Sequence, residues 1–209
     1  MPPPAGIPRP TVQRLSLYLR ELESAQHDGR HTISSSAIAR AFGFTDAQVR
    51  RDLGCLGQTG RPGVGYQTAF LASRIRGALS LDRTWNLAIV GTGKIGSALM
   101  RYPRFAGGGF KVVAAFDADP ALCGQTIAGV DVRPLSQLAE GVAEANVQLA
   151  VLAVPAEFAQ AVADQLVAAG IQGILNFAPA ALRVDVPVEP IDLSRALEQL
   201  AFRVSSEPS

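Results

Sequence analysis

The sequence predicts an α/β chain with a helical N-terminal domain and a C-terminal domain built on a doubly wound parallel sheet of the Rossmann type. Its 209 residues suffice for two modest domains that each bury a core. Residues 1–82 show amphipathic helical spacing and a glycine-rich stretch, whereas residues 83–190 alternate apolar strands with helices. The last segment, residues 191–209, contains one more amphipathic helix with no obvious neighbour in its own chain.

Composition narrows the class of protein. Apolar residues make up 48% of the chain, and no run of about 20 uncharged residues occurs, so we expect a soluble cytoplasmic protein without a membrane partner. Cys55 and Cys123 lie far apart, which suggests two free thiols. Residues 1–85 carry 11 basic against 6 acidic residues, and residues 86–209 carry 8 against 12. The basic front half indicates a polyanionic partner, although its arginine usage also fits genome composition.

An amphipathic helix opens the first domain. Thr11 is a plausible N-cap for this helix. The apolar positions that follow at helical spacing are Val12, Leu15, Leu19 and Leu22.

Two short helices follow, joined by a tight turn. Ser34 or Ser35 can cap the first of them, which stops at Gly43. Thr45 and Gln48 form a T-x-x-Q capping box that starts the second, and Gly54 is its natural stop. This is the arrangement of a helix-turn-helix, whose second helix enters the major groove of DNA. Short helical hairpins are common in proteins, and the basic balance favours the DNA-binding interpretation.

The glycine-rich stretch GQTGRPGVGYQT completes a winged helix in this interpretation. It predicts a β-hairpin or wing that carries Arg61 at its tip, beside the minor groove or the phosphates. A further helix, TAFLASRIRGALSL, leads to the second domain. The candidate DNA-binding residues are Ser35, Thr45, Gln48, Arg50, Arg51 and Arg61.

From Trp85 onwards the pattern alternates between strands and helices. Strands are predicted over WNLAIV, KVVAAFD, VQLAVLAVP, GILNF and VPVEPI. Helices are predicted over 94–102 and over AEFAQAVADQLVAAG, which presents Phe158, Val162 and Leu166 on one side. The order predicts a parallel sheet that is covered on both faces.

The segment IVGTGKIGSAL carries the spacing G-x-G-x-x-G at Gly91, Gly93 and Gly96. The motif follows an apolar strand and opens a helix whose N-terminal amides would hold a pyrophosphate. Asp117 closes the next strand, 21 residues after Gly96, with Asp119 as a second candidate. A carboxylate there accepts hydrogen bonds from a ribose 2′-OH, which favours NAD(H) over NADP(H). The turn also supplies the candidates Thr92, Lys94 and Ile95.

Two further turns should face the same crevice, because ligands collect at the carboxyl ends of parallel strands. The segments AVPAE and NFAPA end the third and fourth predicted strands. Ordinary strand-end turn chemistry would also explain their prolines. The candidates to flank ribose and nicotinamide are Val154, Pro155, Asn176, Phe177, Ala178 and Pro179.

Residues for hydride chemistry are scarce. His27 and His31 lie in the first domain, and residues 86–209 contain no histidine. Cys123 has no histidine nearby in sequence. We therefore predict no catalytic residue and no metal ligand, although a carboxylate or Tyr102 leaves an NAD-dependent oxidoreductase open as an alternative.

Seven segments in order resemble the Rex family of bacterial redox-sensing repressors: RLSLYLREL, TISSSAIARAFGFTDAQVRRDLG, RPGVGY, IVGTGKIGSAL, AAFDADP, AVPAE and GILNFAP. The resemblance runs from Pro8 to Phe202. It implies a homodimer with N-terminal winged helices, C-terminal Rossmann domains and a C-terminal helix exchanged between subunits. It further implies double-stranded operator DNA as the partner, NADH as the effector that releases the DNA, and NAD+ as its competitor. No second protein is implied.

Carried over by position, the resemblance implies dinucleotide contacts at the three glycines and Asp117, and DNA contacts at Gln48, Arg50, Arg51 and Arg61. It places Tyr102 and Phe202 near the nicotinamide end. One departure concerns the recognition helix: members commonly have Ser-Tyr-Phe-Gly after its Asp-Leu, whereas this chain has Gly54-Cys55-Leu56-Gly57. We expect the end of that helix to be shorter or repacked.

A third interpretation comes from a relative of the Rossmann domain, the CoA-binding domain of acyl-CoA ligases. It would make the chain a nucleotide-binding interaction module. The predicted helix-turn-helix and wing argue against this interpretation and against the oxidoreductase.

Overall fold

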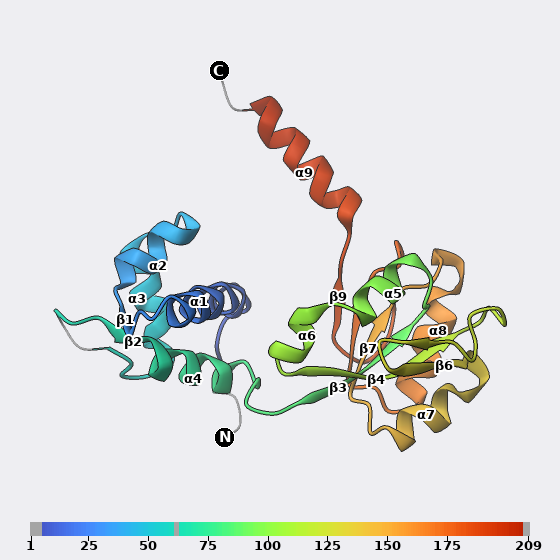
Figure 1. Cartoon of the computed structure of the whole chain (residues 1–209). Coiled ribbons are helices and arrows are strands. Elements are labelled where there is room, and N and C mark those ends of the chain that lie inside the picture. The colour runs from blue at the N-terminus through green and yellow to red at the C-terminus, as the bar shows by residue number, and fades with distance from the viewer. Residues whose placement is uncertain (1–5, 61–62, 207–209) are drawn as a thin grey trace. The chain divides into compact units, whose positions relative to one another are not determined.

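Helices build the first unit of the chain. The computed structural model describes residues 6–60 and 63–206, and its contacts separate Met1–Arg83 from Thr84–Ser209. The helices of the first unit are α1 (Arg9–His27), α2 (Ser35–Phe42), α3 (Asp46–Gly54) and α4 (Thr68–Ala78) (Figure 1). Their core is a cluster of buried side chains that includes Leu15, Tyr18, Leu22, Ile38, Val49, Leu53, Leu71 and Ile75.

The described end of the glycine-rich stretch pairs with a strand from another part of the first unit. Its strand β2 (Tyr66–Gln67) pairs antiparallel with β1 (Thr32–Ile33), which precedes α2. The expected hairpin or wing turns at residues that the structure does not describe, so it stays a prediction. Arg61 lies outside the described residues.

Helix α1 begins earlier than the sequence predicts. Pro8 takes the N-cap position, and Thr11 is buried in the first turns of the helix. The expected cap at Thr11 is wrong, because its hydroxyl donates instead to Asp52 Oδ1 at 3.3 Å. Val12 is exposed, contrary to expectation, whereas Leu15, Leu19 and Leu22 are buried as predicted.

One buried carboxylate joins α1 to α3. Asp52 is 2% exposed and accepts two hydrogen bonds from Arg14, through Nε at 2.6 Å and Nη2 at 2.8 Å. Tyr18 donates to it at 2.8 Å and Gln48 at 2.9 Å. Burial raises the pKa of Asp52, but the hydrogen bonds from Arg14, Tyr18 and Gln48 outweigh burial and leave the pKa below its usual range.

The second unit is a seven-stranded sheet in the order β5-β6-β4-β3-β7-β8-β9. All pairs are parallel except β5 with β6. The strands are β3 (Trp85–Val90), β4 (Phe110–Asp117), β5 (Thr126–Ile127), β6 (Val130–Pro134), β7 (Leu149–Leu152), β8 (Gly173–Asn176) and β9 (Val188–Pro190). From β6 to β9 this is the doubly wound order that the sequence predicts as a fold class. The sequence did not predict β5 and β6, because their segments lack a long apolar run.

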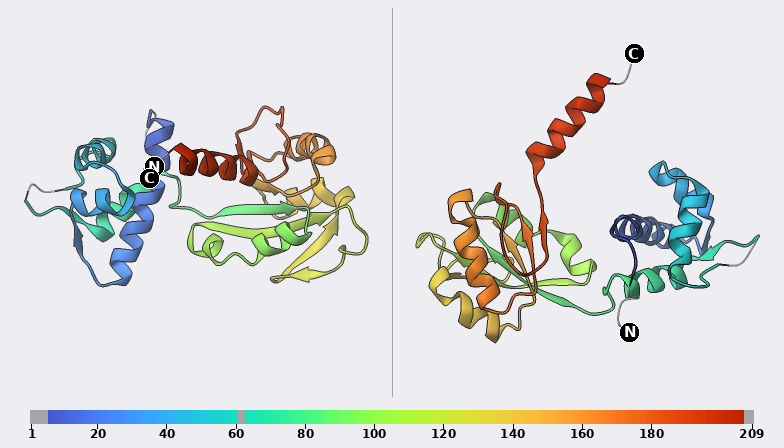
Figure 2. Two further views of the ribbon diagram at one scale, coloured as in Figure 1. Left: turned by 90° about the horizontal axis from the view of Figure 1, so that it is seen from above. Right: turned by 180° about the vertical axis from the view of Figure 1, so that it is seen from behind.

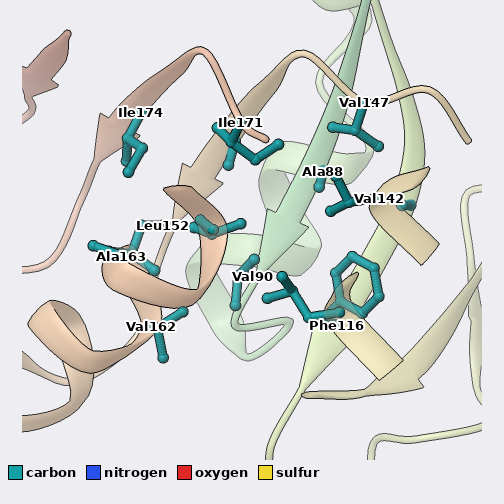
Figure 3. Packing of buried hydrophobic residues seen from close by; sticks show 14 of the residues in the cluster. Ala88, Val90, Phe116, Val142, Val147, Leu152, Val162, Ala163, Ile171 and Ile174 are labelled. Carbon is teal, nitrogen blue, oxygen red and sulfur yellow. The ribbon is translucent and has the colours of Figure 1, made fainter. Parts of the chain in front are cut away.

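Helices cover both faces of this sheet. Ala88 and Val90 of β3 pack with α7 (Leu138–Glu144) and α8 (Ala156–Ala168), in the cluster that Figure 3 shows. The residue between them, Ile89, packs on the other side with Met100 of α5 (Lys94–Met100). Figure 1 and the view from behind in Figure 2 place α5 and α8 on opposite sides of the strands. This alternation explains why the strands read as continuous apolar runs.

Three further elements complete the second unit: α6 (Pro103–Gly107), the 3-10 turn η1 (Leu135–Gln137) and α9 (Leu193–Ser206). No residue of α9 is buried. Within the described ranges, none of the helices has the length and apolarity needed to cross a membrane.

Replacing the buried carboxylate is expected to destabilise the first unit. Asp52→Asn removes the charge that Arg14 and Tyr18 face, and should lower the free energy of unfolding by about 2–4 kcal/mol at pH 7. Urea denaturation followed by circular dichroism measures the change. The control Glu23→Gln, which breaks the half-exposed ion pair with Arg76, should lower it by less than about 1 kcal/mol.

The sign of the pH dependence follows from the lowered pKa. The stabilisation by Asp52 is present above the ordinary carboxyl pKa of about 4 and is lost as the pH falls through the folded-state pKa. The unfolding free energies of the wild type and Asp52→Asn should therefore converge in acid. A constant difference down to pH 2 would contradict this account.

Candidate nucleotide site and nucleic-acid interface

Each glycine of the motif at the end of β3 meets a different steric requirement. Gly91 has φ +88°, and a Cβ there would lie 2.4 Å from Ala153 O. A Cβ on Gly96 would lie 1.8 Å from Gly91 O, so α5 can pack against the turn only without a side chain. A Cβ on Gly93 would meet nothing within 4 Å. The open side of Gly93 is where a Rossmann turn admits a pyrophosphate, so the turn fits a dinucleotide.

Asp117 holds this turn in place. Its Oδ2 accepts hydrogen bonds from Thr92 N at 2.5 Å and Thr92 Oγ1 at 2.9 Å, and its Oδ1 accepts one from Asp119 N at 2.9 Å. Burial raises the pKa of Asp117, but these hydrogen bonds outweigh burial and lower it. The sequence suggested a ribose ligand at this position, and the structure adds a second role, the connection of β4 to the glycine turn.

A cavity of about 790 Å³ lies beside the turn. The candidates that line it are Gly91, Gly93, Lys94, Ile95, Asp117, Asp119, Val154, Pro155, Phe177 and Pro179. Further lining residues were not predicted as site residues, among them Leu122, Leu135, Phe158 and Gln165. Phe158 was expected on the same side of its helix as Val162 and Leu166; those two are buried, whereas Phe158 is 57% exposed in the first turn of α8. Its position three residues after the strand-end Pro155, in the first turn of the helix, was the signal that could have revealed it.

Some candidates shape the site without lining it. Thr92, Asn176 and Ala178 are buried. Asn176 donates from Nδ2 to Ala180 O at 2.8 Å and accepts from Ala178 N at 2.9 Å, so it fixes the turn after β8. Gly96 supports the helix packing described above.

Tyr102 and Phe202 do not line this cavity within a single chain. Tyr102 caps α6, is half exposed and stacks edge-on against Phe105. Phe202 lies on α9 and is 72% exposed. It belongs to an exposed apolar set on that helix: Leu193, Leu197, Leu200, Phe202 and Val204.

The cavity offers few groups for acid–base chemistry. Its charged lining residues are Lys94, Asp117 and Asp119, and Asp117 is engaged with Thr92. Neither histidine, cysteine, serine nor tyrosine lines it. In the part of the chain that the structure describes, no cluster of three potential metal-ligating side chains occurs.

The helix-turn-helix begins both of its helices with the expected type of cap. Ser34 Oγ accepts from Ala37 N at 3.1 Å, so Ser35 is the first residue of α2. Thr45 Oγ1 accepts from Gln48 N at 3.2 Å. The other half of the predicted capping box is wrong, because the Gln48 side chain turns to Asp52. The side chain of Gln48 is therefore held against Asp52, one turn later on the same helix.

The exposed side of α3 carries the two remaining candidates, Arg50 and Arg51. A hollow of about 660 Å³ beside Arg50 is also lined by Ser34, Ser35 and Tyr66. Arg50 pairs with Asp46 on the same helix. Two exposed arginines in the middle of the second helix of a helix-turn-helix are suited to contact DNA phosphates and bases.

The residues that follow Asp52-Leu53, where this chain has an unusual sequence, repack against the core. Helix α3 ends at Gly54, Cys55 is exposed, and Leu56 is buried in the core. Arg74 of α4 donates to Leu56 O at 2.5 Å and fixes the chain as it leaves the helix.

Both units of the chain match families of known proteins. A model described as "CoA binding domain" matches residues 82–180, and one described as "Putative DNA-binding protein N-terminus" matches residues 6–54. The "Redox-sensing transcriptional repressor Rex" of Rhodopirellula baltica is 45% identical over 97% of this chain and 86% of its own. The repressor of the same name from Carboxydothermus hydrogenoformans is 45% identical over 95% of this chain and 96% of its own.

Solved structures give the same result. A Rex-family repressor in complex with β-NAD+ and operator DNA matches with a TM-score of 0.90 and 33% identity, over 96% of this chain and 94% of that chain. The complex of the same repressor with β-NADH matches with a TM-score of 0.85 and 33% identity, over 95% of this chain and 94% of that chain.

The two glycines with opposite surroundings provide a test of the site. Gly93→Ala should weaken NADH binding at least tenfold with an unchanged melting temperature, because its Cβ would enter only the ligand's space. Gly96→Ala should lower both the NADH affinity and the melting temperature, because its Cβ would meet Gly91 O. Isothermal titration and thermal unfolding measure the two effects. Undiminished NADH binding by a folded Gly93→Ala variant would contradict the assignment.

Proposed function

The chain belongs to the Rex family of redox-sensing transcriptional repressors, and from this membership we propose that its N-terminal unit binds operator DNA, which NADH bound in the C-terminal unit releases. As a member of this family it is a transcriptional repressor and not an enzyme. The structures of a relative with NAD+ and operator DNA, and with NADH, support both halves of the proposal. We propose a cytoplasmic location, where that DNA would lie.

The cavity beside the glycine turn is the observation that carries the proposal. Gly93 leaves room for the pyrophosphate, and Asp117 and Asp119 stand at the end of β4, where a Rossmann domain contacts the ribose. The other walls are largely apolar. Reduction of NAD+ removes the positive charge of its nicotinamide ring, so an apolar surrounding favours NADH. The same shortage of acid–base groups that weakens the enzyme alternative suits a sensor, which must bind NADH without consuming it.

DNA binding rests on α3 and its neighbours. Arg50 and Arg51 are exposed, and the side chain of Gln48 is fixed against Asp52. We assign phosphate and base contacts to the two arginines, and we keep Ser35, Thr45 and Arg61 as further candidates for phosphate contacts. The bond of Gln48 to Asp52 uses one side-chain N–H and leaves its second N–H and its Oε1 available for DNA.

We propose that the repressor is a homodimer that exchanges α9 between its subunits. The exposed apolar side chains of α9, Phe202 among them, support this arrangement, since a monomer would leave them in water. Phe202 and Tyr102 would then lie near the nicotinamide ends. Two recognition helices must stand about 34–36 Å apart to match adjacent major grooves, so a modest rotation of the subunits spoils both contacts.

The energetic requirement on the ligand is small. If NADH prefers the DNA-free conformation by about 100-fold, each bound molecule shifts the equilibrium by about 2.7 kcal/mol, and two molecules double that. NAD+ competes for the same cavity, but its affinities for the two conformations differ less than those of NADH.

Two alternatives remain weaker. An NAD-dependent oxidoreductase needs a second substrate site and a positioned acid or base, which the cavity lining does not offer. A CoA-binding interaction module agrees with the family model over residues 82–180, but it assigns no task to the helix-turn-helix.

Fluorescence anisotropy of labelled DNA from the protein's own promoter tests the proposal at one fixed salt concentration. We expect NADH to raise the apparent Kd for DNA at least tenfold and NAD+ to leave it nearly unchanged. Gly93→Ala should keep the DNA affinity and lose the response to NADH. Equal DNA affinity with both nucleotides would contradict the proposed function.

A further inference from the structure

The exposed side of α3 carries two adjacent arginines in different electrostatic surroundings. Arg50 Nη1 forms an ion pair with Asp46 Oδ2, one helical turn earlier. For Arg51, no side-chain hydrogen bond or ion pair occurs within residues 6–60 and 63–206. The pair is solvent-accessible, since the Arg50 side chain is 58% exposed and that of Asp46 is 37% exposed. Both arginines are therefore accessible to DNA, but only one carries an uncompensated charge.

The two acids of α3 have different roles. Asp52 is buried and accepts hydrogen bonds from Arg14, Tyr18 and Gln48, so its charge is used within the fold. Asp46 is the first residue of the helix, and its Oδ2 contacts Arg50. Its Oδ1 has no hydrogen-bond partner among the described residues. The charge of Asp46 thus acts on the N-terminal end of its own helix, on Arg50 and on whatever approaches Arg50.

This arrangement affects phosphates and bases differently. A phosphate that approaches Arg50 also meets the negative charge of Asp46, so the pair as a unit gives little attraction to the DNA backbone. A guanidinium has five N–H donors, and the contact with Asp46 leaves the others of Arg50 available. Those donors can still bind a base edge, such as guanine O6 and N7, which carries no net charge.

We propose that Asp46 is a specificity-determining residue of the DNA-binding surface, which suppresses the contribution of Arg50 to sequence-independent phosphate binding and leaves Arg50 to contact bases. The inference rests on the proposed DNA-binding function. Arg51 supplies the backbone attraction that positions the helix. The division favours the operator, because every other site in the genome competes through phosphate contacts alone.

Salt dependence of DNA binding separates this role from a structural one. Each phosphate neutralised by a protein cation contributes a slope of about −0.9 to a plot of log K against log salt concentration. For random-sequence DNA, Asp46→Asn should steepen this slope by about 0.5–0.9 and raise the affinity at 0.1 M salt by about three- to eightfold. Its affinity for the promoter fragment should change by less than about threefold, so the specificity ratio falls.

Matched variants show whether the effect passes through Arg50. Glu23→Gln removes a carboxylate that pairs with Arg76 between α1 and α4, and it should leave the slope of the wild type unchanged. Arg51→Ala should make the slope shallower by about 0.9, and Arg50→Ala should change it by less than half as much. In the Asp46→Asn background, Arg50→Ala should make the slope shallower by about 0.9, as Arg51→Ala does in the wild type. Thermal unfolding checks that each variant is folded.

The outcomes distinguish this inference from the function on which it rests. A steeper slope for Asp46→Asn, abolished by Arg50→Ala, supports it. Promoter binding by the wild type, together with equal slopes for Asp46→Asn and Glu23→Gln, overturns the inference alone. A wild type that binds promoter and random DNA equally overturns the proposed function, whereas one that binds neither overturns both.

Discussion

Two carboxylates, each held by donors from another segment, set the positions on which both binding surfaces depend. Asp52 receives hydrogen bonds from Arg14 and Tyr18 of α1, so α3 cannot shift without breaking a buried ion pair. Asp117 accepts from the backbone and hydroxyl of Thr92, which fixes the glycine turn against β4. Both have lowered pKa values because these hydrogen bonds outweigh burial, so both stay charged at neutral pH. Removing one partner of such a contact leaves an unsatisfied polar group, and this makes each position rigid.

Rigidity of the two surfaces is what allows a small change between them to act as a switch. A recognition helix that could move freely would follow the DNA when the subunits rotate, and a loose glycine turn would hold the pyrophosphate less firmly. With both held, the ligand can act only through the relative position of the two subunits. NADH can shift the conformation only by the difference between its affinities for the two states.

The sequence predicted the parts that depend on local patterns. The caps at Ser34 and Thr45, the buried face of α1 and the strand, turn and helix around Gly91–Gly96 follow from residue type and spacing. Contacts between distant segments escaped prediction: Thr11 turns to Asp52, and Tyr66–Gln67 pairs with Thr32–Ile33. The bond from Gln48 to Asp52, one turn later on the same helix, also escaped prediction. The spacing put Phe158 on one side of its helix with Val162 and Leu166, but it could not show that Phe158 borders the cavity. The strand β6 was missed because its charged residues interrupt the apolar pattern.

The most direct test of the coupling is the affinity for NADH measured by isothermal titration with and without saturating promoter DNA. Binding free energies are linked reciprocally, so the factor by which NADH weakens DNA binding must equal the factor by which DNA weakens NADH binding. We predict a Kd for NADH that is at least tenfold higher in the presence of the promoter fragment and unchanged with random DNA at the same concentration. An identical Kd for NADH with and without the promoter would contradict the claim that the nucleotide is the signal.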